Sequence, residues 1–560
     1  MITACTLNCP DACSLCVSPH AQGVTVRGNP DHPITQGLIC PKIHRYFDRL
    51  SSPERITAPM LRSRRTWEEI SWDDALEICA RQLEGVLAED PAKLVHISGF
   101  GARGVSKMVV DRFFAALGCT GIQGSLCDET GIAASILDFG ALDHNPLQDL
   151  RNSQWIVNWG RDVRRSSIHL QHILQQARKG NTRVVSIWPG GEGFDPFSDQ
   201  CLRIAPGTER FLALAVLKIL EDRGGLSSQA MHTCRDWPLL RSLLYTYELQ
   251  EVADICDVHE EDIYYLAGIY GQHPVATLMG WGLQRIRYGG QNVRWIDALA
   301  WLSGNTGTKG AGAFFNISSA RNFDLSWLPE KPRRQVLLPR LGREIEESTD
   351  PALSMAWING MNPVNQAPES RRVARALRQL DFTVVVDAFW TDTALCADLI
   401  LPCTLMGEEE EVLGSCGHDC IQLAREVCSP PSGARSDLWI VQGLNKGLNL
   451  GLEIMDRNAC FERSLKVPDG AATMQKLRDK GFVQTRGDRP AFEQGPAHAD
   501  GLFHGPVHIT AEPKPDWPYP FRLLSLVRRE AMSSEILRNS EAGVPEMRPT
   551  GSAYQQNTRL

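Results

Sequence analysis

Four cysteines fall within the first forty residues, and their spacing restricts what this end of the chain can fold into. Cys5, Cys9 and Cys13 follow a C-x3-C-x3-C pattern, and Cys40 returns from a distance. Thiolates arranged in this way suit an iron–sulfur cubane, in which each iron takes one soft ligand. Zinc is the competing interpretation, but its ligands usually pair about two to four residues apart on two knuckles. The spacing favours a [4Fe-4S] cluster, with the nearby Cys16 as a bystander.

The composition is that of a globular chain that does not bind nucleic acid. Its 560 residues are 43% hydrophobic and 22% charged, and at roughly 150 residues per domain they predict several domains. The 58 basic and 66 acidic side chains give a net charge of −8, which would repel phosphate backbones. No apolar run approaches the roughly 18 residues of a membrane helix. We therefore expect no nucleic-acid partner and no membrane span.

The amino-terminal residues show no export signal. Met1 to Cys5 contain no basic segment, apolar run or twin-arginine pair. Seventeen cysteines remain thiols most readily in a reducing compartment. The sequence therefore predicts a cytoplasmic protein.

Past Trp72, helical stretches alternate with short β-branched runs, which predicts an α/β fold with largely parallel sheets. Ser71 and Asp74 are expected to cap the first long helix. Segments 155–187 and 356–387 each read as strand, helix, strand. The expected strands are 94–98, 155–159, 184–188, 275–279, 355–359, 384–387 and 399–401.

Strand–helix–strand units bind nucleotides beyond the carboxyl ends of their strands, where glycine permits close approach and a helix start presents N–H groups. Gly160 and Gly360 stand at these positions in the two units. Two units would suit two dinucleotides, although many α/β enzymes contain such a pair by construction.

Three amino-terminal segments resemble the opening of the molybdopterin-guanine-dinucleotide oxidoreductases: CTLNCPDAC at 5–13, GNPDHP at 28–33 and GLICPK at 37–42. That family includes formate dehydrogenases, thiosulfate and polysulfide reductases and nitrate reductases. The resemblance implies a [4Fe-4S] cluster and a molybdenum or tungsten ion held by two molybdopterin guanine dinucleotides (bis-MGD). It also implies that Lys42 lies between the cluster and a pterin.

The resemblance implies a multi-domain fold with an N-terminal iron–sulfur domain over 1–53 and two Rossmann-like halves with parallel sheets. The first half is expected over 121–329, and the second over 54–120 plus 330–465. The family continues with a C-terminal β-barrel, so residues 466–560 are expected to be a linker and a truncated terminal region. A separate chain is then a possible source of the barrel.

Other segments imply contacts to the dinucleotide of the first half. Gly207, Thr208 and Glu209 resemble the family's P-G-T-D, whose acid accepts hydrogen bonds from guanine; they equally suit a helix start. Arg285, in GWGLQR at 280–285, is expected to anchor a pterin phosphate or to pair with an acid. The family's acid and proline after the second strand are replaced by WPGG at 188–191, so a ribose contact there is lost or replaced.

In the second half, Gly360, Asn362, Asp387 and Asp398 resemble the segments that meet the other dinucleotide. Each lone aspartate equally suits a turn or a helix cap.

Cys127 occupies the position from which family members supply a cysteine or selenocysteine to the metal. A thiolate at a helix start is favoured, although a buried structural thiol is the plainer interpretation. Asp128 follows where formate enzymes usually have histidine, which disfavours formate as the substrate. Asp128, Glu129 and Asp11 are candidate proton carriers, and each also suits a cap or a loop.

The resemblance therefore implies a two-electron oxidoreductase acting on a small molecule, either formate dehydrogenase-like or sulfur-compound reductase-like, with a non-redox hydration also open. Its electrons would pass to a ferredoxin-like protein or an iron–sulfur subunit. The alternative is a non-catalytic relay or scaffold subunit that keeps the cluster without the pterin metal. A second metal site at Cys416 and Cys420 is disfavoured, and the acidic run at 408–411 is expected to be a solvated face.

Overall fold

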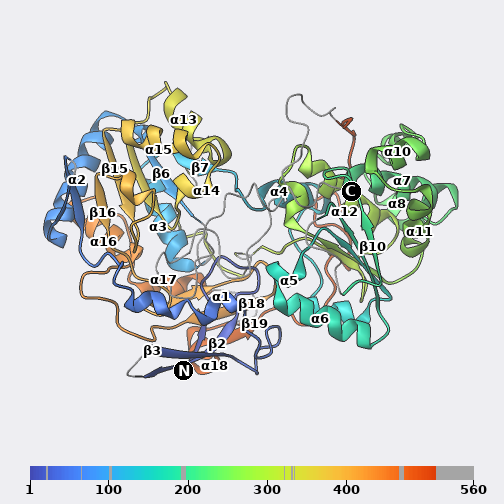
Figure 1. Ribbon diagram of the computed structural model, residues 1–560, viewed down its shortest axis with the longest axis horizontal. Coiled ribbons are helices and arrows are strands. Elements are labelled where there is room, and N and C mark those ends of the chain that lie inside the picture. The colour runs from blue at the N-terminus through green and yellow to red at the C-terminus, as the bar shows by residue number, and fades with distance from the viewer. Residues whose placement is uncertain are drawn as a thin grey trace, which may run out of the picture.

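The computed structural model describes residues 1–512, except 21–22, 65, 100–103, 191–196, 319, 321, 329–331, 333 and 466–471. Figure 1 shows two α/β lobes side by side, with small sheets below and between them that include the amino-terminal strands. Both lobes are built on sheets with parallel strands. The predicted α/β class is confirmed.

The first lobe contains a parallel sheet with the strand order β10-β9-β8-β11-β12. Its strands are β8 (Trp155–Trp159), β9 (Arg183–Trp188), β10 (Gln200–Arg203), β11 (Val275–Met279) and β12 (Gly312–Phe314). Its helices are α4 (Glu129–Phe139), α5 (Val163–Ser166), α6 (Ile168–Lys179), α7 (Glu209–Asp222), α8 (Ser228–His232), α9 (Trp237–Leu243), α10 (Leu249–Cys256), α11 (Glu260–Tyr270) and α12 (Gly289–Leu302).

The second lobe contains a sheet with the order β5-β4-β16-β15-β14-β6, in which β4 pairs antiparallel with both β16 and β5. Its strands are β4 (Met60–Ser63), β5 (Thr66–Glu69), β6 (Leu94–Ser98), β14 (Met355–Asn359), β15 (Phe382–Val386) and β16 (Leu399–Leu401). Its helices are α2 (Trp72–Glu89), α3 (Val105–Ala116), α13 (Leu341–Glu347), α14 (Pro363–Gln366), α15 (Ser370–Gln379), α16 (Asp437–Gly447) and α17 (Arg457–Ser464).

Each parallel sheet is buried on both faces, because helices cover both sides. In β8, Val157 and Trp159 face one core, whereas Ile156 faces the core beneath α6. In β14, the Trp357 side chain likewise faces one hydrophobic core and the Ile358 side chain faces another. Strands buried on both faces read as continuous apolar runs, which is why each expected strand is present.

Two details of the expected elements are settled by the structure. The strand expected at 384–387 is shifted and spans Phe382–Val386. Ser71 caps α2 as predicted, since its side chain accepts a hydrogen bond from the Asp74 backbone N–H.

Two small antiparallel sheets lie between and below the lobes (Figure 1). One consists of β1 (Ile2–Ala4), β2 (Ser14–His20) and β3 (Gly23–Gly28), followed by α1 (Pro41–His44). The other joins β17 (Glu411–Leu413) and β18 (Cys420–Ala424) to β19 (Phe482–Gln484), which follows α18 (Met474–Lys480). A short parallel pair joins β7 (Gly121–Gln123) to β13 (Gln335–Leu337).

The region expected to be a linker therefore contains a helix and a strand that completes a sheet. Its Pro- and Gly-rich composition concealed them. The segments expected to mark the truncated terminal region fall on residues 513–560, outside the described residues. Within the described residues, no helix combines the length and the apolar character needed to cross a bilayer.

The expected solvated face at 408–411 is wrong for two of its glutamates. The Glu408 carboxylate forms a bidentate ion pair with Arg55, and both side chains are 1% exposed. Glu411 is also buried and accepts a hydrogen bond from the Ser106 backbone N–H. Burial raises the pKa of Glu411 to about 8, with a further contribution from Glu409. An acidic run read on its own gives no sign of a distant arginine that buries it.

Candidate functional site

The four amino-terminal cysteines lie at the ends of regular elements. Cys5 follows β1 and Cys13 precedes β2, and the Cys5 backbone N–H donates to the Cys13 carbonyl at 2.8 Å. Cys9 lies in the loop between them, and Cys40 is the residue before α1. The hairpin and the helix start therefore hold the two cysteine-bearing segments, which we call the Cys9 loop (residues 5–13) and the Cys40 segment (residues 37–42).

These cysteines influence one another electrostatically, and Cys5 and Cys13 are buried whereas Cys9 and Cys40 are half-buried. Burial raises the pKa of Cys9 well above its usual value, as do Asp11, Cys5 and Cys40. Burial likewise raises the pKa of Cys13, with contributions from Cys5, Asp11, Cys9 and Cys40. Among the described residues, no three His, Cys, Asp or Glu side chains converge on the position of a single metal ion. A cubane differs from such a site because its irons take their thiolates at separate corners.

Asp11 ties the Cys9 loop to the first lobe. Its carboxylate accepts hydrogen bonds from Ser167 Oγ at 2.7 Å and from His169 Nδ1 at 2.6 Å. Burial opposes ionisation of Asp11, but His169, Ser167 and Arg161 outweigh it and lower the pKa. Asp11 therefore links the Cys9 loop to the start of α6.

The loop after β8 lies against the cysteines. Burial lowers the pKa of Arg161, while Asp11, Cys416 and Cys9 act in the opposite direction. Lys42 is buried and donates from Nζ to the Arg165 carbonyl at 3.3 Å. Lys42 and Arg161 thus connect the Cys40 segment and the Cys9 loop to the chain that follows Gly160.

A segment from the other end of the chain supports the Cys9 loop. Ser415 Oγ donates to the Pro10 carbonyl, and His418 Nε2 donates to the Asp11 carbonyl at 2.8 Å. Gln422 bonds the Ala12 carbonyl. The CGHDC motif at 416–420 therefore packs against the Cys9 loop.

Gly160 lies where the order of strands reverses in the first sheet. β8 lies between β9 and β11 in the sheet, and its last residue, Trp159, is paired with Met279 of β11. Gly160 (φ 68°) and Gly280 therefore follow adjacent strand ends, and a Cβ on Gly280 would overlap the Gly160 carbonyl. A Cβ on Gly160 would meet open space. Ligands of open α/β sheets bind at such a switch point.

The second sheet repeats this arrangement. Asn359 of β14 is paired with Ser98 of β6, so Gly360 (φ 60°) and Gly99 follow adjacent strand ends at the reversal of strand order. A Cβ on Gly99 would overlap the Gly360 carbonyl. The two lobes thus present equivalent loops of closely packed backbone.

The residues from 207 to 209 form the start of α7. Gly207 has φ 88°, and Thr208 Oγ1 donates to the Ala205 carbonyl at 2.7 Å. The Glu209 carboxylate is buried and accepts a hydrogen bond from Asn292 Nδ2 at 2.9 Å. These contacts match the helix-start interpretation and place Glu209 against α12.

The residues expected to meet the dinucleotide of the second half fall into two groups by position in the sheet. Asn362 and Asp387 follow the carboxyl ends of β14 and β15: Asn362 Oδ1 accepts from Thr393 Oγ1 at 2.6 Å, and Asp387 accepts from the Ala388 N–H at 2.7 Å. Burial raises the pKa of Asp387 to about 6.

Asp398 lies elsewhere. It precedes β16 and accepts from the Thr383 N–H at 2.8 Å, near the start of β15. Because β15 and β16 are parallel, Asp398 lies at the opposite edge from Gly360, and we leave it out of the proposed site.

Cys127 lies in the loop between β7 and α4, where two side chains from the 280–285 segment hold it. Arg285 Nε donates to the Cys127 carbonyl at 2.8 Å, and Arg285 Nη2 lies 3.3 Å from Cys127 Sγ. Gln284 Nε2 donates to the same carbonyl, and its Oε1 accepts from the Gly131 N–H at 3.2 Å. Arg285 therefore contacts the cysteine at both its sulfur and its backbone.

Asp128 is buried at the start of α4. Its Oδ2 accepts from Asn316 Nδ2 at 2.9 Å, and Ser125 Oγ lies 3.4 Å from Oδ1. Glu129, in contrast, is exposed. The contacts of Asp128 support a role in positioning the Cys127 loop.

Sequence reasoning missed several residues of this site. Gly99 directly follows a predicted strand and Arg161 follows another by two positions, so a strand end was a usable signal for both. His169 and Gln284 carried no signal of their own, because a lone histidine or glutamine is usually structural.

Comparisons with known proteins agree with this geometry. Residues 55–446 match the model of the family described as Molybdopterin oxidoreductase, and residues 2–51 match the Molybdopterin oxidoreductase Fe4S4 domain. The chain is 34% identical over 498 residues to the Probable oxidoreductase YyaE of Bacillus subtilis (strain 168), covering 86% of this chain and 74% of the relative.

Two more distant relatives are informative. The F420-dependent formate dehydrogenase subunit alpha of Methanocaldococcus jannaschii is 25% identical over 460 residues, covering 76% of this chain and 67% of the relative. Acetylene hydratase from Pelobacter acetylenicus superposes with a TM-score of 0.78 at 17% identity, over 90% of this chain and 77% of that chain. The latter similarity shows a shared fold.

Proposed function

The chain belongs to the molybdopterin oxidoreductase family, and from this membership we propose that it performs two-electron chemistry on a small molecule at a bis-MGD centre. The matched families confirm the expected oxidoreductase, its molybdenum- or tungsten-pterin cofactor and its [4Fe-4S] cluster. The bis-pterin arrangement, the residues that contact it and the substrate are the proposal.

The observation that carries the proposal is the repeated switch point. In each lobe, two adjacent parallel strands are each followed by a glycine. The pairs are Gly160 with Gly280 and Gly360 with Gly99, and in each pair the two backbones pack directly against each other. Loops of close-packed backbone at the switch point of a parallel sheet suit the phosphates of a dinucleotide. Two equivalent loops, one in each lobe, support one dinucleotide per lobe, with Asn362 and Asp387 beside the second loop.

The cysteines fit the cluster. Cys5, Cys9, Cys13 and Cys40 are four soft donors gathered at one place, and the raised pKa values of Cys9 and Cys13 reflect burial that disfavours the bare thiolates. Iron would supply the compensating charge. We assign all four as cluster ligands, with Lys42 and Arg161 lying between the cluster and the pterin that the loop after β8 would hold.

Cys127 is the proposed protein ligand of the pterin-held metal. When bound, that metal supplies the redox chemistry, while the chain orients it. Arg285 Nη2, 3.3 Å from Cys127 Sγ, favours the ionised sulfur that a metal ligand requires. Asp128, fixed by Asn316, holds the loop that carries Cys127.

The proposed substrate class follows from the side chains that surround Cys127. Arg285 is exposed beside Cys127, so a cationic group faces the place where substrate would approach. We therefore propose that the substrate is a small anion and the reaction formate dehydrogenase-like or sulfur-compound reductase-like, with electrons exchanged with an iron–sulfur partner protein. The relative's name, F420-dependent formate dehydrogenase subunit alpha, is consistent with the first of these.

The test is metal and nucleotide analysis of enzyme purified anaerobically from its own host. We expect about one molybdenum or tungsten ion and about two guanine nucleotides per chain. Cys127→Ser should abolish viologen-linked turnover, whereas Cys201→Ser, a half-buried cysteine of β10, should leave it intact. Iron without the heavier metal would instead favour the relay subunit, and full turnover of Cys127→Ser would remove that residue from the metal's ligands.

A further inference from the structure

We propose that His169 is a positioning residue of the iron–sulfur cluster, which joins the Cys9 loop and the Cys40 segment to α6 and directs an imidazole N–H at the Cys13 sulfur. This inference rests on the proposed assignment of the four cysteines as cluster ligands. It concerns a residue that lies far from them in the sequence and belongs to the first lobe.

The first contact of the ring fixes the Cys9 loop. His169 Nδ1 lies 2.6 Å from Asp11 Oδ2, while Ser167, which caps α6, donates to the other carboxylate oxygen at 2.7 Å. The start of α6 therefore binds both oxygens of Asp11, which lies between Cys9 and Cys13. The side chain of His169 is 1% exposed, so water does not compete for these bonds.

The second contact reaches the Cys40 segment and a ligand sulfur. His169 Nε2 lies 3.1 Å from the Leu38 carbonyl and 3.7 Å from Cys13 Sγ. The Asp11 carboxylate and the Leu38 carbonyl only accept hydrogen bonds. Each ring nitrogen therefore carries a proton, and the Nε2 proton is shared between the carbonyl and the sulfur.

This geometry has an electrostatic consequence for the cluster. Reduction adds negative charge to the cluster, and hydrogen bonds to its cysteine sulfurs are among the features that set its potential. A buried donor acts in surroundings of low dielectric, where its effect is large. The N–H of Nε2 should stabilise the reduced cluster and raise its midpoint potential. A residue that only held α6 in place would not affect that potential.

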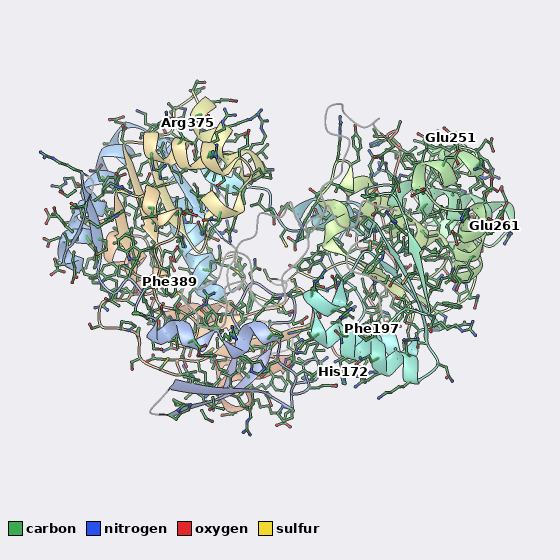
Figure 2. The ribbon with its side chains drawn as sticks, viewed as in Figure 1. His172, Phe197, Glu251, Glu261, Arg375 and Phe389 are labelled. Atoms are coloured by element: carbon green, nitrogen blue, oxygen red, sulfur yellow. The ribbon has the colours of Figure 1, made fainter. Side chains whose placement is uncertain are left out.

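The experiment uses the full-length enzyme and measures the midpoint potential by an EPR-monitored redox titration, with iron content measured in parallel. His169→Asn places an amide near the position of Nδ1 and loses the donor at Nε2. His169→Gln places its amide near the position of Nε2 and keeps that donor. His172→Asn is the matched control, because His172 lies on the same helix (Figure 2) and bonds Gln176.

We expect His169→Asn to lower the midpoint potential, His169→Gln to lie nearer the wild type, and His172→Asn to be unchanged. Cluster loss in His169→Asn with retention in His169→Gln would also support the inference. A wild-type potential in His169→Asn, or cluster loss in both variants, would overturn it. Wild-type enzyme that contained no iron would overturn the proposed cysteine ligands as well, so the two failures are distinguishable.

Discussion

Arg285 holds Cys127 at two points, with Nε 2.8 Å from the carbonyl oxygen and Nη2 3.3 Å from the sulfur. The two residues are 158 positions apart, and the contact joins the start of α4 to the segment that follows β11. A planar guanidinium with donors in a fixed fork is suited to two such bonds at once, whereas a lysine ammonium is not. The orientation of the Cys127 side chain therefore depends on Arg285.

We expect Arg285→Gln to lower turnover by about 10–100-fold, the usual effect of removing a partner that orients a metal ligand. Viologen-linked activity and metal content are measured together. Arg287→Gln is the control, because Arg287 lies two residues away and stacks over Tyr288. Unchanged activity of Arg285→Gln at full metal content would contradict the role of Arg285.

The glycine loops give a second prediction. A Cβ at Gly280 would overlap the Gly160 carbonyl, so Gly280→Ala should displace that loop at a cost of about 1–3 kcal/mol, as overpacking usually does. The variant should also release less guanine nucleotide on denaturation than the wild type.

The control for this substitution is Gly268→Ala, an exposed position of α11 where an added Cβ meets nothing within 4 Å. It should keep full nucleotide content, because alanine is the better helix former. If Gly280→Ala carried as much nucleotide as this control, the first switch point would not be a cofactor loop.

Glu408 and Glu410 of the acidic run at 408–411 differ in how far water reaches their carboxylates. Glu408→Ala leaves Arg55 buried without its carboxylate partner and should cost about 3–5 kcal/mol of stability. Glu410, whose side chain is 27% exposed and 3.5 Å from Arg478, should cost no more than about 1 kcal/mol when changed to alanine. The midpoints of thermal unfolding report the difference, and equal shifts in the two variants would refute it.

A buried pair of aspartates predicts a pH dependence of stability. Burial raises the pKa of Asp297 to about 7 and that of Asp138 well above its usual value. Arg294 bonds Asp138 at 2.6 Å, and Ser135 bonds Asp297 at 2.9 Å. Because the folded pKa values lie above the unfolded value of about 3.9, folding binds protons. The contribution is complete below about pH 4 and is lost as the pH rises through about 7.

Asp297→Asn should therefore reduce the fall in the thermal-unfolding midpoint between about pH 5.5 and about pH 8. Asp254→Asn, an exposed position in the same lobe, should leave that fall unchanged. Parallel profiles for the wild type and Asp297→Asn would show that the aspartate pair does not titrate in this range.

Short patterns of neighbouring residues were enough to predict several strands, a helix cap and the cysteine set of this protein. The strands at β8 and β14 were readable because a strand buried on both faces is apolar throughout, and this property needs no knowledge of its neighbours. The Ser71 cap depends on a bond to a residue three positions away. The four proposed cluster ligands were identified by spacing, because three of them lie in one short loop and the fourth follows within forty residues.

The sequence by itself determined the fold class, the cysteine set and the family, since each depends on residues close together in the chain or on recognisable segments. Only the tertiary structure decided that Glu408 is buried against Arg55, 353 residues away, and that Asp398 lies at the opposite end of its sheet from Gly360. It also decided that His169 meets Asp11 and that Arg285 meets Cys127. Such contacts join elements that are distant in sequence, and their partners are set by how the lobes and sheets pack together.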